Sequence, residues 1–299
     1  MTDALSDPLS DHPRPIANAA QRRARLRAIL AGPDCVHPAS TWDPLSARIA
    51  QDAGFECGML AGSVASLAAL GAPDLILLTL SEFAETARRI SRACGLPVIA
   101  DADHGYGNGL NALRTVEELE TAGVAGLTIE DTALPRPFGE REMRLVSRAE
   151  AVGKLKAALA GRSDPGLCVF GRTGALAVTG LADAVDRLKA FQDLGVDGVF
   201  LTGATQRAQI EALAKAARVP ILLGGVPGDL LDRPFLAAHG VRVALQGHQP
   251  IAAALAAIEA TMRALRAGAP LPPLADASRM EALSAAALWR ARTRDFLDE

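Results

Sequence analysis

The chain has 299 residues, of which 49% are hydrophobic and 4% aromatic, and its formal net charge is −3. This length suits one large domain with its own core, whereas the small negative charge excludes a basic surface for nucleic acid. The four cysteines form no CxxC pair and no apolar stretch reaches the length of a membrane span, so we expect a soluble, cytoplasmic protein with reduced thiols and no membrane partner.

The predicted elements begin after a polar, proline-bearing start. We expect residues 1–19 to be a disordered tail, followed by a helix over residues 20–30. Short apolar runs then alternate with longer stretches of helical periodicity, which indicates βα units around a parallel sheet. The strands are predicted over residues 35–38, 57–61, 98–101, 127–130, 168–171, 198–201, 221–223 and 241–245. The helices between and after them are predicted over residues 43–51, 81–93, 110–121, 149–160, 181–193, 205–217 and 233–238. Eight such units favour a (β/α)8 TIM barrel over residues 20–267.

The end of the chain carries a separate segment. Residues 268–273 read Gly-Ala-Pro-Leu-Pro-Pro, which breaks the helix that follows the last strand. Beyond this linker Met280, Leu283 and Ala287 recur at helical spacing, which predicts a C-terminal helix within residues 268–299. Because an apolar helix beyond a linker gains stability only by packing, we expect it to form an oligomer contact.

The third strand ends on two acids and enters a glycine-rich loop. Residues 101–107 read Asp-Ala-Asp-His-Gly-Tyr-Gly. Side chains at positions i and i+2 of a strand share a face, so Asp101 and Asp103 can both meet one hard cation such as Mg²⁺. The glycines let the backbone turn sharply beside a ligand.

Polar residues also follow other predicted strands. They are Ser63 after the second strand, Glu130 and Asp131 after the fourth, Arg172 after the fifth and His248 after the eighth. Barrel active sites gather at the carboxyl ends of the strands. We therefore expect the acids to hold a cation, and Arg172 and His248 to balance an anionic substrate whose carboxylate Ser63 clamps.

Several of these residues also fit a structural role. Asp131 is typical of an N-cap for the next helix, and Arg172 is equally compatible with neutralising a barrel acid. A single His248 is more often a rim residue than a catalyst. His104 suggests zinc, but no second His or Cys stands at ligand spacing, which disfavours that interpretation. Five strand ends that supply acids, Arg, His and Ser together are harder to explain by capping.

At these residues the sequence resembles the isocitrate lyase/phosphoenolpyruvate mutase superfamily, and most closely its oxaloacetate decarboxylase family. The resemblance runs from about Cys35 to the helix after His248. It rests on Gly62-Ser63-Val64-Ala65-Ser66, on the run at residues 101–107, on Thr128-Ile129-Glu130-Asp131 and on Arg172-Thr173.

The resemblance implies a metal, a substrate and an assembly. It implies Mg²⁺ held mainly by Asp101, with Asp103 and Glu130 acting through waters, and Mn²⁺ suits such oxygen ligands equally. It also implies an α-keto acid, oxaloacetate, bound by Ser63, Arg172 and His248, and a homotetramer in which the C-terminal helix crosses between subunits. Loss of CO2 would leave a pyruvate enolate, whose charge the metal and Arg172 stabilise, while His248 orients the substrate or supports protonation.

Three departures from the family pattern keep other functions open. Residues 133–146 lack the cysteine that the carbon–carbon lyases of the superfamily use as an acid, which disfavours isocitrate cleavage. Gly174 stands where an Asn, Asp or Glu is usual, and residues 224–226 read Gly-Gly-Val where polar or aromatic groups are usual. We expect a larger and less polar pocket on that side. The alternatives are therefore a lyase or hydrolase of a larger 2-oxo or 2-hydroxy diacid, and a barrel that no longer catalyses a reaction.

Overall fold

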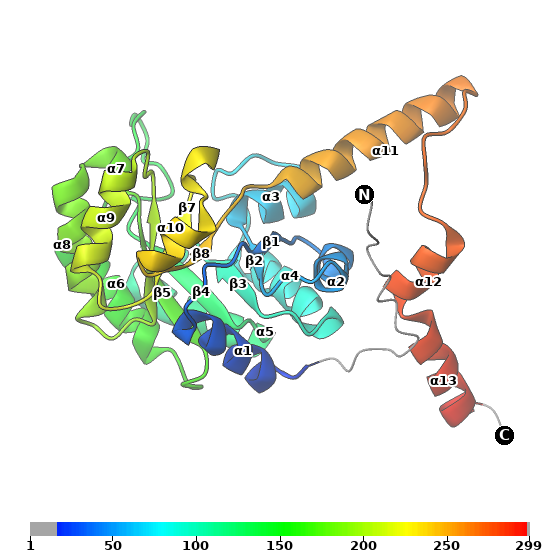
Figure 1. The fold of residues 1–299 in the computed structure, drawn as a ribbon, viewed down its shortest axis with the longest axis horizontal. Helices are drawn as coiled ribbons and strands as arrows, with labels where there is room; N and C mark the ends of the chain where they lie inside the picture. Colours follow the sequence, from blue (N-terminus) through cyan, green and yellow to red (C-terminus); the bar gives the residue numbers. More distant parts are fainter. Residues whose placement is uncertain (1–16, 298–299) are drawn as a thin grey trace. The chain divides into compact units, whose positions relative to one another are not determined.

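The computed structural model describes residues 17–297, and its strands form one parallel eight-stranded sheet in the order β1 to β8. The strands are β1 (Ala39–Ser40), β2 (Gly58–Leu60), β3 (Val98–Asp101), β4 (Gly126–Glu130), β5 (Cys168–Thr173), β6 (Gly198–Thr202), β7 (Ile221–Gly224) and β8 (Val241–Ala244). Val36 closes the ring, because its N–H donates to Arg242 and its carbonyl accepts from Ala244, each at 2.9 Å. The predicted (β/α)8 barrel is confirmed (Figure 1).

The first strand is the one that the sequence misplaces. The prediction over residues 35–38 is wrong, since β1 spans Ala39–Ser40 and only Val36 of the predicted run bridges to β8. Pro38 has no N–H to donate, and the pairing of Val36 with β8 therefore does not continue beyond it. The other strands begin and end within two residues of their predicted bounds.

Helices surround the strands. They are α2 (Pro44–Asp52), α3 (Gly62–Leu70), α4 (Leu80–Ala93), α5 (Gly109–Ala122), α6 (Arg148–Ala160), α7 (Ala175–Val178), α8 (Leu181–Gln192), α9 (Arg207–Ala216) and α10 (Arg233–Ala238), with a 3₁₀ turn η1 (Gly228–Leu230). The sequence analysis missed α3 and α7. Neither has a side-chain N-cap, so the usual start signal is absent.

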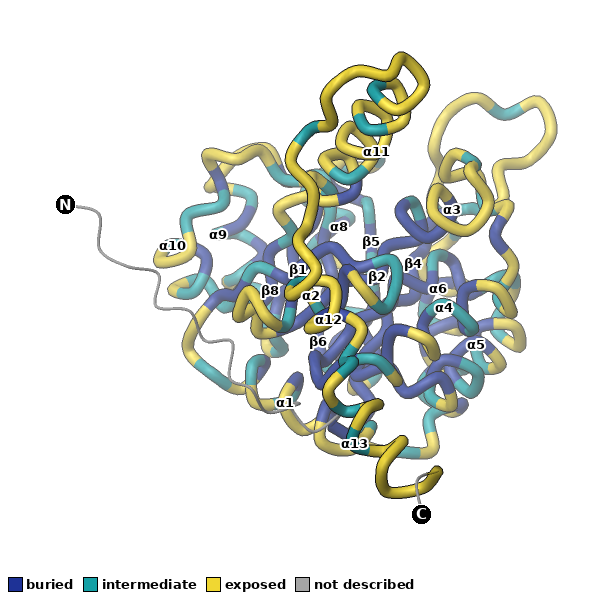
Figure 2. The backbone as a smooth tube through the Cα atoms, turned by 90° about the vertical axis from the view of Figure 1, so that its right-hand side faces the viewer, coloured by how far each residue is buried: buried dark blue, intermediate teal, exposed yellow. Residues whose placement is uncertain are grey.

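The barrel has an apolar layer outside the strands and a second one inside. Alternate strand residues such as Ile99, Phe170, Phe200 and Leu222 point inward, where they pack with Leu26 and other residues of one cluster. The strands are the most continuously buried part of the chain in Figure 2. The side chains at the carboxyl ends of the strands pack directly against this interior layer.

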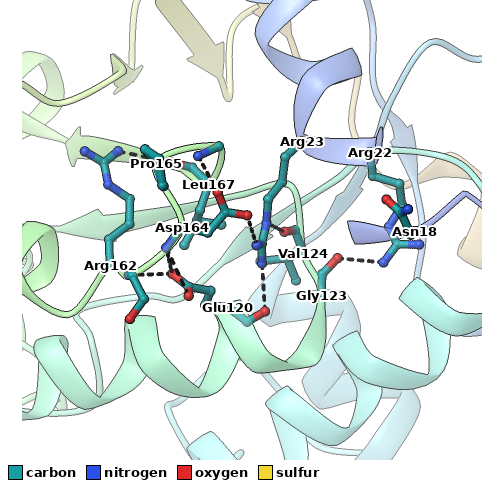
Figure 3. A network of polar contacts seen from close by, with 12 residues as sticks. Asn18, Arg22, Arg23, Glu120, Gly123, Val124, Arg162, Asp164, Pro165 and Leu167 are labelled. Carbon is teal, nitrogen blue, oxygen red and sulfur yellow. Dashed lines mark hydrogen bonds and ion pairs between the residues drawn. The ribbon is translucent and has the colours of Figure 1, made fainter. Parts of the chain in front are cut away.

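Helix α1 (Ala19–Ala31) covers the amino ends of the strands. Its Leu26 packs into the barrel interior, and its Arg22 donates to the carbonyl of Gly123 at 3.0 Å. Arg23, only 5% exposed, donates to the carbonyls of Val124 and Glu120 and pairs with Asp164, as Figure 3 shows. Because α1 closes this end, a substrate must enter at the opposite, carboxyl end of the strands.

A second compact unit contains residues 255–297 of the described chain. Helix α11 (Gln249–Ala267) begins in the barrel unit and continues into this one, which also contains α12 (Ala277–Ser284) and α13 (Ala286–Leu297). The prediction of a single C-terminal helix is wrong, because Ala285 adopts a left-handed conformation with φ 55° and separates two helices. The predicted tail over residues 1–19 lies largely outside the described residues.

Two further features of residues 17–297 concern membrane-spanning helices and the state of the cysteines. No helix in this range is long and apolar enough to cross a membrane. All four cysteines are free and buried.

Candidate active site

Asp101 ends strand β3 with its carboxylate largely buried at the open end of the barrel. The residue is 8% exposed. Its Oδ1 accepts a hydrogen bond from the Thr128 hydroxyl at 2.9 Å, and its Oδ2 accepts one from Nη1 of Arg172. Thr128 stands beside Asp101 because β3 and β4 pair in this register. The carboxylate is therefore held from two neighbouring strands.

Arg172 lies inside β5, next to its last residue, and connects two acids. Besides its bond to Asp101, its Nε lies 3.0 Å from Oε2 of Glu130, an ion-pair distance at which no hydrogen bond is aligned. Burial alone would lower the pKa of Arg172, but Asp101 and Glu130 outweigh burial and raise that pKa. Arg172 is therefore a fixed positive charge among the acids.

Asp103 lies against the first turn of α3. A Cβ built on Gly62 would fall 2.8 Å from Oδ1 and 3.0 Å from Oδ2 of Asp103. Ser63, the next residue of this turn, is half-buried. Burial raises the pKa of Asp103 well above its ordinary value, and the charges of Asp101 and Glu130 raise it further. The carboxylate thus meets the end of a helix that favours negative charge.

Glu130 and Asp131 follow each other but have different partners. Glu130 is 7% exposed, and burial raises its pKa although Arg172 counteracts part of the shift. Asp131, 1% exposed, pairs with the buried Arg187 of α8 at 2.9 Å. The N-cap of the following helix α6 is Ser147 instead. The N-cap interpretation of Asp131 is therefore wrong, and Asp131 holds α8 against the barrel.

His248 enters the site from the loop after β8. Its Nδ1 lies 2.9 Å from Oγ of Ser40, at the end of β1. Burial lowers the pKa of His248, which Asp101 and Asp74 partly oppose through their negative charge. Asp74 stands on the exposed loop after α3, and partial desolvation and the charge of Asp101 raise its pKa. The structure thus brings Asp74, Asp101, Arg172 and His248 into electrostatic reach of one another.

His104 belongs to no group of three His, Cys, Asp or Glu side chains that could hold a metal among residues 17–297. It is 2% exposed, and burial lowers its pKa to about 4, so the ring is neutral near pH 7. Its Nδ1 makes no hydrogen bond within the described chain. Tyr106, in the same loop, adopts φ 57° and has a pKa that burial and the site acids raise. The rings of the buried His104 and the half-buried Tyr106 lie 6.2 Å apart between their centres.

The unusual glycines do not all leave open space. A Cβ on Gly224 would lie 2.7 Å from Cζ of Phe200, so the phenyl ring already fills that position. The expectation of a wider pocket is therefore wrong at Gly224. A Cβ on Gly174 would make ordinary contact with Thr202 Oγ1 at 3.5 Å, and one on Gly225 would meet no atom within 4 Å.

The acids suit a divalent cation through their charge and their oxygen donors. Burial first, and then the negative charges of Asp101 and Glu130, raise the pKa of Asp103, while Arg172 opposes the shift. However, among residues 17–297 no three His, Cys, Asp or Glu side chains form a ready ligand set. The arrangement fits one direct carboxylate ligand with water-mediated neighbours better than a closed cage of protein ligands.

Sequence reasoning missed four residues of this site. Thr128 and Ser40 are found only through the partners that strand register gives them, and Asp74 follows a helix that was not predicted. In the sequence, Gly62 and Thr128 stand out only as members of motifs. The small residue Gly62 before Ser63 was the one signal in the sequence that another side chain approaches the backbone closely at this position.

Comparisons with known proteins show the family to which the chain belongs. The family model described as phosphoenolpyruvate phosphomutase matches residues 26–266. A protein of Bradyrhizobium diazoefficiens named oxaloacetate decarboxylase is 56% identical over 279 residues, which cover 92% of this chain and 97% of the relative. One of the same name from Rhodopseudomonas palustris is 55% identical, with the same coverage.

Solved structures give the same picture. An oxaloacetate acetylhydrolase in complex with 3,3-difluorooxalacetate superposes with a TM-score of 0.82 at 30% identity, over 93% of this chain and 97% of that one. A phosphonopyruvate hydrolase in complex with oxalate and Mg²⁺ gives a TM-score of 0.81 at 30% identity, over 92% and 99%. This chain therefore belongs to the phosphoenolpyruvate phosphomutase family and is an enzyme similar to the oxaloacetate decarboxylases.

Proposed function

We propose that the enzyme is a carboxy-lyase that converts oxaloacetate into pyruvate and CO2 with Mg²⁺ as cofactor. The observation that carries this proposal is the placement of Arg172 between Asp101 and Glu130. This placement puts one permanent positive charge beside a group of acids at the carboxyl ends of the strands, the end of the barrel that α1 does not cover. The relatives named oxaloacetate decarboxylase, at about 55% identity, support the choice of substrate.

Asp101 would hold the cation directly, and Asp103 and Glu130 would hold its waters. When bound, Mg²⁺ would supply a Lewis acid for the 2-oxo acid end of the substrate. Arg172 and His248 would bind the substrate from the other side, and Ser63 with the backbone of the first turn of α3 would bind a carboxylate.

Decarboxylation needs no covalent nucleophile. The bond between C3 and C4 breaks, CO2 leaves, and the electron pair forms the enolate of pyruvate, with the charge on the C2 oxygen. The guanidinium of Arg172 stabilises that charge as it develops. A proton then adds to C3. His248, neutral and held by Ser40, orients the substrate or passes this proton.

The test is release of pyruvate and CO2 from oxaloacetate with and without Mg²⁺, corrected for the metal's own catalysis. Metal-dependent turnover in the wild type and its loss in Asp101→Ala and Arg172→Ala are expected. Formation of oxalate and acetate instead would identify a hydrolase, as the name of the acetylhydrolase neighbour suggests. Faster turnover of bulkier diacids would favour the second candidate function, which the space at Gly174 and Gly225 motivates. Absence of turnover of any 2-oxo or 2-hydroxy diacid would indicate an inactive barrel.

We also propose that the enzyme is a cytoplasmic homotetramer whose C-terminal segment joins subunits. Helices α12 and α13, which lie beyond Gly268, expose the large apolar side chains Met280, Trp289 and Phe296. The buried free cysteines suit a reducing compartment. Light scattering on protein truncated after Gly268 tests the assembly, and an unchanged particle size would contradict it.

A further inference from the structure

Phe200 of strand β6 lies directly beside Arg172 of β5. The two residues are paired in the strand register, so their side chains are on the same face of the sheet. Cζ of Arg172 stands 5.3 Å from the centre of the Phe200 ring, within the range of a cation–π contact. Phe200 is 2% exposed and belongs to the apolar cluster inside the barrel. The ring therefore lies between the apolar interior of the barrel and the guanidinium of Arg172.

The position of this ring depends on Gly224 of β7. A Cβ there would lie 2.7 Å from Cζ and 2.8 Å from Cε2 of Phe200, closer than side chains tolerate. The ring sits among the tightly packed residues of the interior cluster, so it has little space into which it could withdraw. The absence of a side chain at Gly224 thus leaves the space that the Phe200 ring occupies, so the two residues form a sterically coupled pair.

The two acids bound to Arg172 do not fix it by themselves. Asp101 and Glu130 both come from strands on one side of Arg172, and both are needed for the cation in the proposed function. Asp101 accepts a hydrogen bond from Nη1, and Glu130 lies 3.0 Å from Nε, which makes no hydrogen bond within the described chain. The neutral ring on the other side competes for none of these N–H donors. It therefore stabilises the guanidinium without taking up an N–H group that a substrate oxygen could use.

We propose that Phe200, in the place that Gly224 leaves free, is a positioning residue that fixes the guanidinium of Arg172 for the charge that develops during decarboxylation. This inference rests on the proposed function, in which Arg172 stabilises the enolate.

The variant Phe200→Leu removes the ring face but keeps an apolar side chain. Phe170→Leu is the matched control, because Phe170 belongs to the same interior cluster and is fully buried. We expect kcat of Phe200→Leu to fall about tenfold, as for loss of a partly desolvated cation–π contact, with a smaller change in KM. Phe170→Leu should lose stability but keep kcat close to the wild type. Equal kcat in both variants would overturn the inference.

Gly224→Ala tests the pair from the other side. The added methyl should displace the ring and lower kcat as Phe200→Leu does, whereas the double variant should be no worse than Phe200→Leu alone, since the smaller leucine makes room. If the fold losses in kcat of the two single variants multiply in the double variant, Gly224 acts independently of Phe200, which would contradict the proposal.

A readout without substrate separates this inference from the proposed function. Phenylglyoxal labels arginine, and mass spectrometry can follow Arg172 in metal-free protein. Faster labelling of Arg172 in Phe200→Leu than in Phe170→Leu is expected, and it supports positioning even if the wild type fails to decarboxylate oxaloacetate. Unchanged labelling together with unchanged kcat in an active enzyme overturns the inference while the proposed function stands.

Discussion

The carboxylate of Asp103 occupies the space that a side chain on Gly62 would need. A Cβ at Gly62 would approach Asp103 Oδ1 to 2.8 Å, and Gly62 is the first residue of α3. We expect Gly62→Ala to push Asp103 away from the other acids. The rate of metal-dependent oxaloacetate decarboxylation should fall about tenfold or more, and the free energy of unfolding should fall by about 1–3 kcal/mol. Steady-state kinetics and denaturant unfolding measure the two effects.

Gly153→Ala is the control for this substitution. Gly153 is exposed within helix α6, and a Cβ there would meet no atom within 4 Å. The alanine should therefore raise the free energy of unfolding by about 0.5–1 kcal/mol through helix propensity and leave the rate unchanged. A Gly62→Ala enzyme with wild-type kinetics would show that Asp103 has no role that depends on its position.

Thr128 orients Asp101 through a single hydroxyl group. Thr128→Val removes the donor to Asp101 Oδ1 but keeps the shape of the side chain. Because a hydrogen bond to a charged group contributes about 1.5–3 kcal/mol, we expect weaker binding of Mg²⁺, by about tenfold or more. Titration calorimetry with Mg²⁺ measures this effect. Thr128→Ser keeps the hydroxyl and should bind Mg²⁺ nearly as the wild type does; a loss as large as that of valine would refute the role of the hydrogen bond.

Protonation of His248 should destabilise the folded protein. Burial lowers the pKa of His248 in the folded state below its ordinary value of 6.5, so the unfolded chain binds more protons between those two pKa values. The stability that the neutral ring contributes is present above pH 6.5 and is lost as the pH falls through the folded-state pKa.

Comparison with His248→Gln isolates this effect, because the other histidines remain. In metal-free protein, the free energy of unfolding of the wild type should decrease more between pH 7.5 and pH 5 than that of His248→Gln. Chemical denaturation at both pH values measures the difference. Parallel decreases would mean that the folded state does not disfavour the charged ring.

Most of the fold follows from patterns within short segments. Strands β3 to β8 are apolar runs bounded by glycine and helix signals, and the barrel follows from eight such repeats. Helices α3 and α7, which were missed, and strand β1, which was misplaced, have no such local signal. Helix α3 begins at Gly62 without a capping side chain, and β1 consists of two residues after Pro38.

The residues of the site also differ in how far the sequence alone predicts them. Asp101, Asp103, Glu130 and Arg172 are readable because each stands at or near the end of a recognisable strand. Their partners are not, because contacts between β3 and β4 or between β5 and β6 depend on register and on side-chain direction. Phe200 shows the limit most clearly: in sequence it is one apolar residue of a buried strand, and only the fold places its ring beside a guanidinium.

Asp131 should be required for stability, since its carboxylate pairs with a buried arginine. Asp131 and Arg187 have side chains only 1% and 7% exposed, and they lie 2.9 Å apart. Asp131→Ala would leave the Arg187 guanidinium with one carboxylate partner, Asp183, near the surface. We expect a loss of about 3 kcal/mol in the free energy of unfolding, as for other broken buried pairs. Asp193→Ala breaks the exposed pair with Arg218 and should cost no more than about 1 kcal/mol. Urea unfolding of both variants decides the matter. Similar small losses would mean that water or Asp183 replaces the missing carboxylate, whereas a large loss confined to Asp131→Ala assigns this aspartate to holding α8 on the barrel.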